Sequence, residues 1–502
     1  MGPRRRGPPR ADGRPQGDPP ARARRVRPDA PVVTVDDDVL ARVDRVFAER
    51  VANGVAPSSV WGVFDRDGLV ASGGHGDRGD GRAPDADTVY RIASCTKSVT
   101  AATLLTLVAD GRLDLDAPVT DFVPAFDAVR LPTPDSPVPT LRMLLTMSAG
   151  FPTDDPWADR QESTTDADLD AVLTAGLLFD SVPGTGFAYS NLGYALLGRV
   201  VSVVTGRPYT EAATTAVLRP LGLDATVFAA DRSDGFVVVG TRPDGTGWEQ
   251  LPLSGPGAFS AIGGLFSTVT DLARWGRHLA SAFSETPEPG PLSPADRRAM
   301  QQALRVVPPS VLPGATRATA YGLGLFVEQD ERSGPIASHS GGYPGFSAHM
   351  RWSTRDGLGV VAFENATQAK VATAATTALD LVLSAHGSST DAPRVAPETR
   401  AAQGRVTELL RHWDDATADA VCTPNVALDE PYERRRQAIA EAAAAIGADL
   451  GAEPVAEESL TPTHLRWWLP GTSGRLRVEI RLAPLAAGLV QTLIVRSEPS
   501  EQ

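Results

Sequence analysis

The sequence predicts an α+β domain of roughly 350 residues. The main observation is a hairpin signal near each end of that stretch. Strand-like runs at Ser59–Phe64 and Leu69–Ser72 flank one polar turn that contains glycine, and runs at Ser347–Trp352 and Gly359–Phe363 flank another. Segments with helical spacing lie between the two hairpins. Strands near both ends with helices between them are typical of an α+β fold, and a layered α/β domain is the alternative.

Helices are expected where apolar residues recur at helical spacing and end signals are present. The first carries acidic residues early and Arg50 late, which the helix dipole favours. The segment after Ser94 is apolar on most faces, which indicates a buried helix that ends at Gly111. Thr268 and Asp271 form a capping-box pattern at the start of another helix. The expected helices span 35–51, 94–110, 191–204, a segment from 268 onward, and 371–384.

The chain of 502 residues is predicted to contain four parts. Residues 1–33 are rich in Arg, Pro and Gly and poor in large apolar side chains, so we expect a disordered tail. Residues 34–388 form the main domain, and the polar stretch 389–399 is a linker. Residues 400–502 begin with a strongly helical stretch, Arg400–Ala448, and end with strand-like runs. This last part is predicted to be a small α+β domain, for which the sequence suggests no role.

Composition and charge exclude several classes of function. The net charge of −13 argues against a nucleic-acid partner. Cys95 and Cys422 lie far apart, which predicts neither a disulfide framework nor a metal site. Apolar stretches are too short to cross a bilayer, and no apolar signal segment follows the clustered arginines near the start. We therefore expect a cytoplasmic protein without stable membrane insertion, and the sequence does not predict its oligomeric state.

Lysine is so scarce in this chain that Lys97 stands out. Of 48 basic residues 46 are arginine, and the two lysines are Lys97 and Lys370. Arginine stays protonated in proteins, whereas a desolvated lysine can lose its proton and act as a base. Lys97 follows Ser94 at the i, i+3 spacing that places both side chains on one helix face. Because serine needs a neighbouring base to become a nucleophile, the pair predicts a nucleophile and its base. The alternative is a solvated lysine beside a serine cap.

A second motif, Tyr189-Ser190-Asn191, stands at the start of an expected helix. Tyrosine can relay a proton if nearby cations lower its pKa. Asparagine offers both a donor and an acceptor to a substrate amide. The alternative interpretation is that Tyr189 is a core residue and Asn191 an N-cap.

A third motif, His339-Ser340-Gly341-Gly342, precedes an expected strand. Two glycines let the backbone approach a ligand closely, and the backbone amides can then bind an oxyanion. The alternative is a turn with an incidental histidine.

The order of these motifs resembles that of a known family. Ser-x-x-Lys at Ser94–Lys97 is followed by Tyr-x-Asn about 95 residues later and by His-x-Gly about 150 residues after that. The chain is similar to the penicillin-recognising serine hydrolases, in the branch that joins class C β-lactamases, D-alanyl-D-alanine carboxypeptidases, D-aminopeptidases and β-lactamase-like esterases. The resemblance covers about residues 35–385. Further matching segments are Tyr90–Ala93, Leu144–Gly150, Pro183–Thr185 and Gly263–Thr268.

The resemblance implies a fold and a catalytic apparatus. The fold is an antiparallel sheet flanked by helices, with an all-helical lobe. Ser94 would be acylated, and Lys97 and Tyr189 would share the proton transfers. The backbone N–H groups of Ser94 and Gly342 would form the oxyanion hole. Neither a metal nor an organic cofactor is implied.

The resemblance also implies substrate contacts through Asn191, His339 and Gly341, with Asn191 on the substrate amide. Here the chain departs from the family. True β-lactamases and transpeptidases carry Lys-Thr-Gly, whose lysine helps to hold a substrate carboxylate, and His339 replaces that lysine. A neutral imidazole gives a weaker electrostatic field and can itself move protons. The departure resembles the D-aminopeptidase and esterase side of the family.

We therefore expect a serine hydrolase that works through an acyl-enzyme on Ser94. Its substrates would be esters or small peptide-like amides, D-amino-acid amides among them, so its partner is a small molecule or a short peptide. One alternative is a β-lactamase or D,D-carboxypeptidase. Another is a non-catalytic module that binds or senses β-lactams or peptides. A third assigns the activity to the C-terminal domain, with the hydrolase as its scaffold.

Overall fold

The computed structural model describes residues 35–245, 247–311, 316–386, 395–457, 459 and 461–500. The predicted tail, 1–33, and residues 389–394 of the predicted linker lie outside these ranges.

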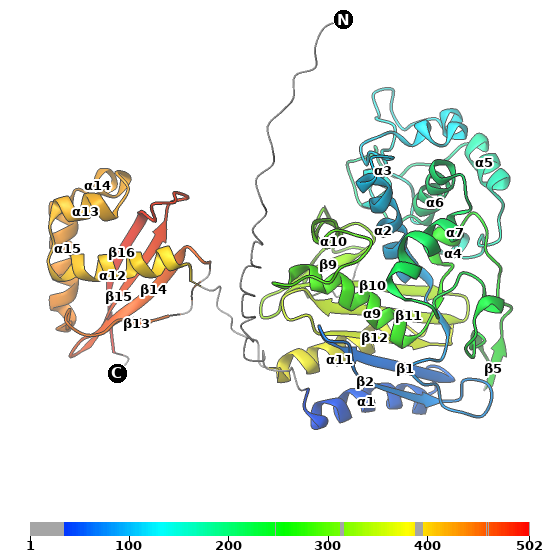
Figure 1. Ribbon diagram of the computed structural model, residues 1–502, viewed down its shortest axis with the longest axis horizontal. Coiled ribbons are helices and arrows are strands. Elements are labelled where there is room, and N and C mark those ends of the chain that lie inside the picture. Colours follow the sequence, from blue (N-terminus) through cyan, green and yellow to red (C-terminus); the bar gives the residue numbers. More distant parts are fainter. Residues whose placement is uncertain are drawn as a thin grey trace, which may run out of the picture. The chain divides into compact units, whose positions relative to one another are not determined.

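One large antiparallel sheet organises the main domain (Figure 1). Its strands in the described ranges are β1 (Ser58–Phe64), β2 (Leu69–Gly76), β7 (Arg305–Val306), β8 (Ala318–Tyr321), β9 (Phe326–Asp330), β10 (Gly334–Tyr343), β11 (Phe346–Ser353) and β12 (Gly359–Glu364). Their spatial order is β2-β1-β12-β11-β10-β9-β8-β7. Both predicted hairpins, β1–β2 and β11–β12, are present. Strand β1 pairs with β12, from Ser59 opposite Glu364 to Phe64 opposite Gly359. The sheet thus joins the two ends of the domain, which confirms the α+β fold.

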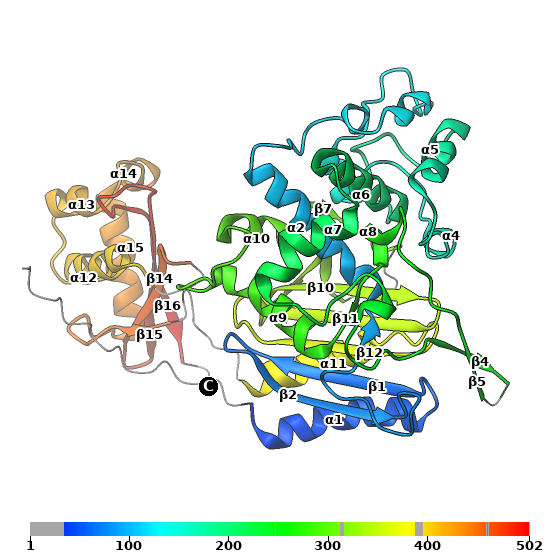
Figure 2. The ribbon, with the colours of Figure 1, turned by 45° about the vertical axis from the view of Figure 1, so that its right-hand side comes forward.

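Helices cover both faces of this sheet (Figures 1 and 2). Helices α1 (Asp37–Ala52) and α11 (Ala372–Ala385) pack against each other and against one face, and α9 (Val269–Ala280) packs on the other. Helix α1 begins where the Asp36 carboxylate accepts a hydrogen bond from the amide of Asp38. Its buried residues, Val39, Val43 and Phe47, recur every four positions and so form one apolar stripe against the sheet.

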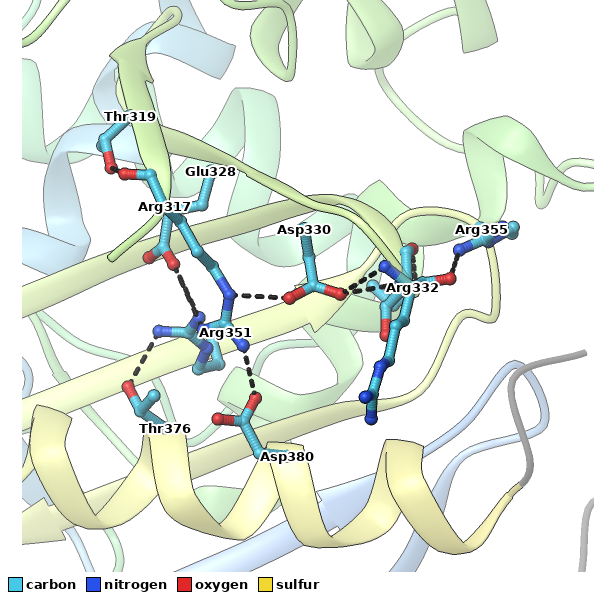
Figure 3. Close-up of polar contacts among 11 residues, drawn as sticks. Arg317, Thr319, Glu328, Asp330, Arg332, Arg351, Arg355, Thr376 and Asp380 are labelled. Atoms are coloured by element: carbon cyan, nitrogen blue, oxygen red, sulfur yellow. Dashed lines mark hydrogen bonds and ion pairs between the residues drawn. The ribbon is translucent and has the colours of Figure 1, made fainter. Parts of the chain in front are cut away.

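A network of ion pairs fastens α11 to the strands on its face (Figure 3). Arg317, which precedes β8, donates to Asp330 on β9 at 2.7 Å and to Asp380 on α11 at 3.0 Å. Arg351 on β11 is buried and donates to Glu328 on β9 at 3.0 Å. Because β10 lies between β9 and β11, these pairs hold in place the strand that carries the third motif.

The remaining elements of the main domain form a helical lobe beside the sheet (Figure 2). Its helices are α2 (Thr96–Ala109), α3 (Leu141–Leu145), α4 (Asp155–Ala158), α5 (Asp166–Ala175), α6 (Asn191–Thr205), α7 (Tyr209–Ala213), α8 (Ser260–Gly263) and α10 (Pro294–Met300). Outside the large sheet are two short strand pairs, β3 (Tyr90–Arg91) with β6 (Phe266–Ser267) and β4 (Thr241–Asp244) with β5 (Gly247–Gln250). Every residue of α2 from Thr96 to Leu105 is buried, as the apolar pattern predicted.

Two expectations for helix starts need correction. The helix predicted from Ser94 begins with a 3-10 turn, Ala93–Cys95, and the α-helix starts at Thr96. The capping box predicted at Thr268 is present only in half: its side chain accepts from the amide of Asp271. The Asp271 carboxylate instead accepts from the Ala225 amide and the Thr226 hydroxyl, since these partners from a distant segment lie closer.

The C-terminal domain has its own core. Among its described residues, the helices are α12 (Pro397–Arg411), α13 (Asp415–Val421), α14 (Asn425–Asp429) and α15 (Tyr432–Ile446). The strands β13 (Val455–Ala456), β14 (His464–Pro470), β15 (Gly474–Leu482) and β16 (Val490–Pro499) form an antiparallel sheet in that order. Helix α12 begins three residues before the predicted domain start at 400. The predicted helical stretch is divided, and Pro424 and Pro431 stand at helix N-caps because proline cannot donate within a helix.

Candidate active site

The predicted nucleophile lies on a tight turn between β3 and α2. Ala93, the residue before Ser94, has a φ of +45°, a left-handed conformation that costs an ordinary residue about 1–2 kcal/mol. Strand β10 passes directly beside this turn: a Cβ added at Gly341 would lie 2.2 Å from the carbonyl oxygen of Ile92. Only glycine permits that approach. The turn therefore holds Ser94, which is 7% exposed, against the strand of the third motif.

Lys97 is fully buried, and its ammonium group donates to the predicted nucleophile. The Nζ atom lies 2.9 Å from Ser94 Oγ, 2.6 Å from Asn191 Oδ1 and 2.9 Å from the carbonyl oxygen of Ile262. Burial lowers the pKa of Lys97 to about 8, although the nearby carboxylates, above all Asp155, oppose that shift. The structure thus brings together the predicted pair and rejects the interpretation of Lys97 as a solvated lysine.

Tyr189 directly precedes α6 and faces the same ammonium group. Its ring centre lies 5.0 Å from Lys97 Nζ, and its ring stacks on Phe326 with centroids 6.4 Å apart. Burial and then the charge of Asp155 raise the pKa of Tyr189 well above its usual value, while a hydrogen bond with Ser94 lowers it. The condition given for a proton relay, a pKa lowered by nearby cations, is therefore not met, because desolvation is the largest effect on this phenol. Tyr189 is a neutral phenol at the nucleophile.

Asn191 is the first residue of α6, and its amide is fully buried. The Oδ1 atom accepts from Lys97, and Nδ2 donates to the carboxylate of Asp155 at 2.6 Å. The alternative interpretation of Asn191 as an N-cap is wrong. The cap is Ser190, whose hydroxyl accepts from the amide of Gly193.

His339 lies on β10 within a group of aromatic rings formed by Tyr189, Tyr321 and Phe326. It is 1% exposed, and both ring nitrogens have partners. Nδ1 donates to the carbonyl oxygen of Ser340 at 2.6 Å, so Nε2 accepts from the Tyr321 hydroxyl at 3.1 Å. Burial, with help from the charge of Lys97, lowers the pKa of His339 to about 3. The imidazole is neutral and contributes no charge to the site.

The two glycines of the third motif differ in their surroundings. Gly341 is buried against the nucleophile turn, whereas Gly342 is exposed and a Cβ there would meet no atom within 4 Å. The pairing of β9 with β10 ends at Ser338, while β11 pairs with β10 as far as Tyr343. The edge of β10 beyond Ser338 is thus turned towards the nucleophile rather than towards another strand. The backbone oxyanion hole at Gly342 stays a prediction that this arrangement permits.

Several residues of this site were not found from the sequence. Asp154 and Asp155 at the start of α4 and Asp159 directly after its end act on Lys97 through their charges. Arg91 forms a buried ion pair with Glu162 at 2.8 Å. The Arg91 guanidinium also lies 3.7 Å from the ring centre of Tyr343, at the end of β10. The acidic residues lie in one segment around α4, whereas Arg91 is on β3 and Tyr343 on β10. No spacing in the sequence connects these elements, and the only signal was the acidic composition of residues 152–160.

A metal-ligand cluster and a membrane-spanning helix are both absent from the described residues. Within the described residues, no group of three or more His, Cys, Asp or Glu side chains is placed to hold a metal ion. In the same part of the chain, no helix is long and apolar enough to cross a membrane.

The fold and the Ser94–Lys97 pair define a class, the serine hydrolases with a Ser-x-x-Lys nucleophile. The family model for Beta-lactamase matches residues 43–384, which is more than half of the chain. This chain belongs to that family, as the order of its motifs predicted.

Relatives and solved structures agree with this assignment. "Protein flp" of Staphylococcus aureus is 27% identical over 289 residues, 55% of this chain and 53% of that protein, so the chain spans about half the length of this relative. The "D-alanyl-D-alanine-carboxypeptidase/endopeptidase AmpH" of Escherichia coli is 28% identical over 295 residues, 56% of this chain and 72% of that protein. A D-stereospecific amidohydrolase from Streptomyces sp. superimposes with a TM-score of 0.55 at 26% identity, covering 68% of this chain and 98% of the other.

Proposed function

We propose that this chain hydrolyses esters or small peptide-like amides, D-amino-acid amides among them, through an acyl-enzyme on Ser94. The observation that carries the proposal is the 2.9 Å contact between Ser94 Oγ and a fully buried Lys97 amine. A buried lysine with a pKa of about 8 is poised to accept the proton of a serine. A module that only binds its ligand has no need of such a base.

Acylation starts at the Ser94 hydroxyl. Lys97 is neutral in about a tenth of the molecules at pH 7, given its pKa of about 8. The neutral amine takes the hydroxyl proton as Oγ attacks the carbonyl carbon. The oxyanion accepts hydrogen bonds from the amides of Ser94 and Gly342. Tyr189 gives its phenolic proton to the leaving alcohol or amine and regains one from Lys97, which restores the neutral amine and leaves the acyl group on Ser94.

Deacylation uses the same groups in the reverse order. A water molecule takes the position of the departed alcohol or amine. As its oxygen attacks the ester carbon, its proton passes to neutral Lys97, either directly or through the Tyr189 hydroxyl, which gives its own proton to Lys97 as it takes that of the water. The tetrahedral oxyanion returns to the same two amides. The acid leaves when Ser94 Oγ recovers its proton, so the enzyme ends in its starting state.

The charges around Ser94 support neutral or cationic substrates over carboxylate-bearing β-lactams. His339 is neutral where a lysine would hold a carboxylate. The charge of Arg91 is paired with Glu162 in a buried ion pair. Asp155, by contrast, places negative charge near the base, Lys97. Burial raises the pKa of Asp159 to about 7, so its charge adds to that of Asp155 above neutral pH. The likeness to a D-stereospecific amidohydrolase supports amides as one class of substrate.

A panel of substrates tests the proposal. It contains p-nitrophenyl butyrate, the amides of D- and L-phenylalanine, and a chromogenic cephalosporin. Wild type is expected to hydrolyse the ester or an amide and to carry a transient acyl adduct on Ser94 by mass spectrometry. Ser94→Ala should fall to the buffer rate. Ser202→Ala should keep the wild-type rate, because the Ser202 hydroxyl bonds, among the described residues, only to the carbonyl of Gly198 on its own helix. Equal rates for wild type and Ser94→Ala on every substrate would contradict the proposal.

A second candidate is a β-lactamase or D,D-carboxypeptidase, which the likeness to AmpH favours. Incubation with benzylpenicillin, followed by intact-protein mass spectrometry, distinguishes the candidates. An adduct on Ser94 that forms and disappears indicates a β-lactamase. A permanent adduct without turnover of any substrate favours the sensor module, and no adduct favours the ester or amide hydrolase.

A further inference from the structure

A continuous chain of hydrogen bonds runs from the nucleophile to a carboxylate on α4. Lys97 donates to Ser94 Oγ at 2.9 Å and to Asn191 Oδ1 at 2.6 Å. Asn191 Nδ2 then donates to Asp155 Oδ1 at 2.6 Å. Asp155 therefore reaches the base only through the amide of Asn191.

This geometry leaves the Asn191 amide a single orientation. An ammonium group only donates hydrogen bonds, and a carboxylate only accepts them. The amide must therefore turn its oxygen to Lys97 and its nitrogen to Asp155. The reverse orientation would place two donors together at Lys97 and two acceptors together at Asp155. Asn191 and Lys97 are both 0% exposed, so no bulk water is available to relieve such a mismatch.

We propose that Asp155 is a positioning residue for the general base: it orients Asn191, whose carbonyl oxygen then holds Lys97 against Ser94. The inference rests on the proposed acyl-enzyme function and adds a residue to it. Without the carboxylate, the amide is free to turn over. Lys97 then loses one of its three acceptors and shifts towards the carbonyl oxygen of Ile262, away from Ser94.

The neighbour of Asp155 anchors it in this place. The Asp154 carboxylate accepts from the backbone amides of Asn191 at 2.7 Å and Leu192 at 2.8 Å, which fastens the start of α4 to the start of α6. Pro156 follows Asp155 and restricts the backbone within the first turn of α4. The carboxylate of Asp155 is thus presented to Asn191 by the fold itself, before any substrate binds.

The charge of Asp155 acts on Lys97 as well, and this effect can be separated from positioning. Among the charges that raise the pKa of Lys97 against burial, Asp155 comes first and Asp159 second. Asp159 has no hydrogen bond to Asn191 among the described residues, so its removal changes the charge alone. The titratable and charged groups around Lys97 are Cys95, Asp154, Asp155, Asp159, Tyr189, Tyr194 and His339.

The experiment measures the rate at which Ser94 of the full chain reacts with a fluorophosphonate probe, followed by intact mass between pH 6 and 10. In this reaction the Ser94 Oγ–P bond forms, fluoride leaves, and Lys97 takes the hydroxyl proton before it passes to solvent. The probe needs no knowledge of the substrate. Asp155→Ala removes the acceptor and the charge, Asp155→Asn keeps an acceptor without the charge, and Asp159→Asn is the matched control.

The plateau rate at high pH reports positioning, and the midpoint of the pH profile reports charge. For Asp155→Ala we expect a plateau at least about tenfold below wild type, since misplacing a reacting group is costly. For Asp155→Asn we expect a loss of about threefold, because an asparagine accepts from Asn191 in only one of its own orientations. Asp159→Asn should keep the plateau within about twofold. All these midpoints should move to lower pH, because each substitution removes a negative charge near Lys97.

Two results would overturn the inference, and both differ from failure of the proposed function. If wild type and Asp155→Ala reach the same plateau, Asp155 does not position the base. If Asp155→Ala fails to fold, as shown by its melting curve, equal plateaus for Asp155→Asn and Asp159→Asn overturn the inference instead. If wild type itself does not label at Ser94, the proposed function fails and the inference with it.

Discussion

Replacement of Lys97 by arginine keeps the positive charge and removes the base. At pH 8 a lysine with a pKa of about 8 is neutral in half of the molecules. An arginine, with a pKa above about 12, is neutral in fewer than about one in 10⁴. General-base catalysis contributes about 10²- to 10⁴-fold, so we expect acylation to fall by that factor. The planar guanidinium also cannot reproduce the three contacts, of 2.9, 2.6 and 2.9 Å, that converge on one nitrogen.

The assay is the initial rate of p-nitrophenyl butyrate hydrolysis between pH 6 and 10. The wild-type rate should rise with pH and reach half its plateau near pH 8, because the neutral fraction of Lys97 grows through its pKa of about 8. Lys97→Arg should show no such rise. The matched control is Lys370→Arg, since Lys370 is exposed and is the other lysine of the chain. A Lys97→Arg enzyme that retains a tenth of the activity, or the same pH midpoint, would refute the general-base role.

Two further predictions concern packing around the site. Gly341→Ala places a Cβ 2.2 Å from the carbonyl oxygen of Ile92, so β10 must move away from the nucleophile. The esterase rate should then fall about 10²-fold. Gly342→Ala, which has open space for its Cβ, should lose far less of the esterase rate. A comparable loss in both variants would argue against the close approach. Glu328→Gln leaves Arg351, which is 2% exposed, without its carboxylate, and should lower the free energy of unfolding in urea by about 3 kcal/mol. The exposed ion pair of Arg142 with Asp116 is the control: Asp116→Asn should lower the free energy of unfolding by less than about 1 kcal/mol. If Glu328→Gln and Asp116→Asn lower it equally, the burial of Arg351 is unimportant.

Much of the fold could be predicted because it depends on local patterns. The hairpin β1–β2 follows from two strand-like runs around a polar turn that contains glycine, and the buried helix α2 follows from its apolar residues on most faces. Both signals reside within a dozen or so consecutive residues. The pairing of β1 with β12 was not predicted, because the two strands are about 300 residues apart. A local sequence pattern predicts a strand but not the distant strand with which it pairs.

The electrostatics of the site were harder to predict, because they depend on desolvation. A lowered pKa of Tyr189 was the condition for a proton relay, yet burial raises this pKa well above its usual value. The neutral state of His339, in contrast, was expected from its ordinary chemistry, and burial reinforces it. A pKa shift reflects the whole environment of a group, including residues that the chain brings in from far away.

The sequence by itself determined the pair at the centre of this protein. Ser94 and Lys97 lie one helical turn apart, in a chain whose 48 basic residues include two lysines, and lysine, unlike arginine, can give up its proton. The tertiary structure alone decided what surrounds the pair. Asp155 and Asn191 form a hydrogen bond although they are 36 residues apart in the sequence, and so do Tyr321 and His339, which are 18 residues apart. Helical spacing relates only near neighbours, whereas hydrogen bonds between separate helices and strands form only when the fold brings those elements together.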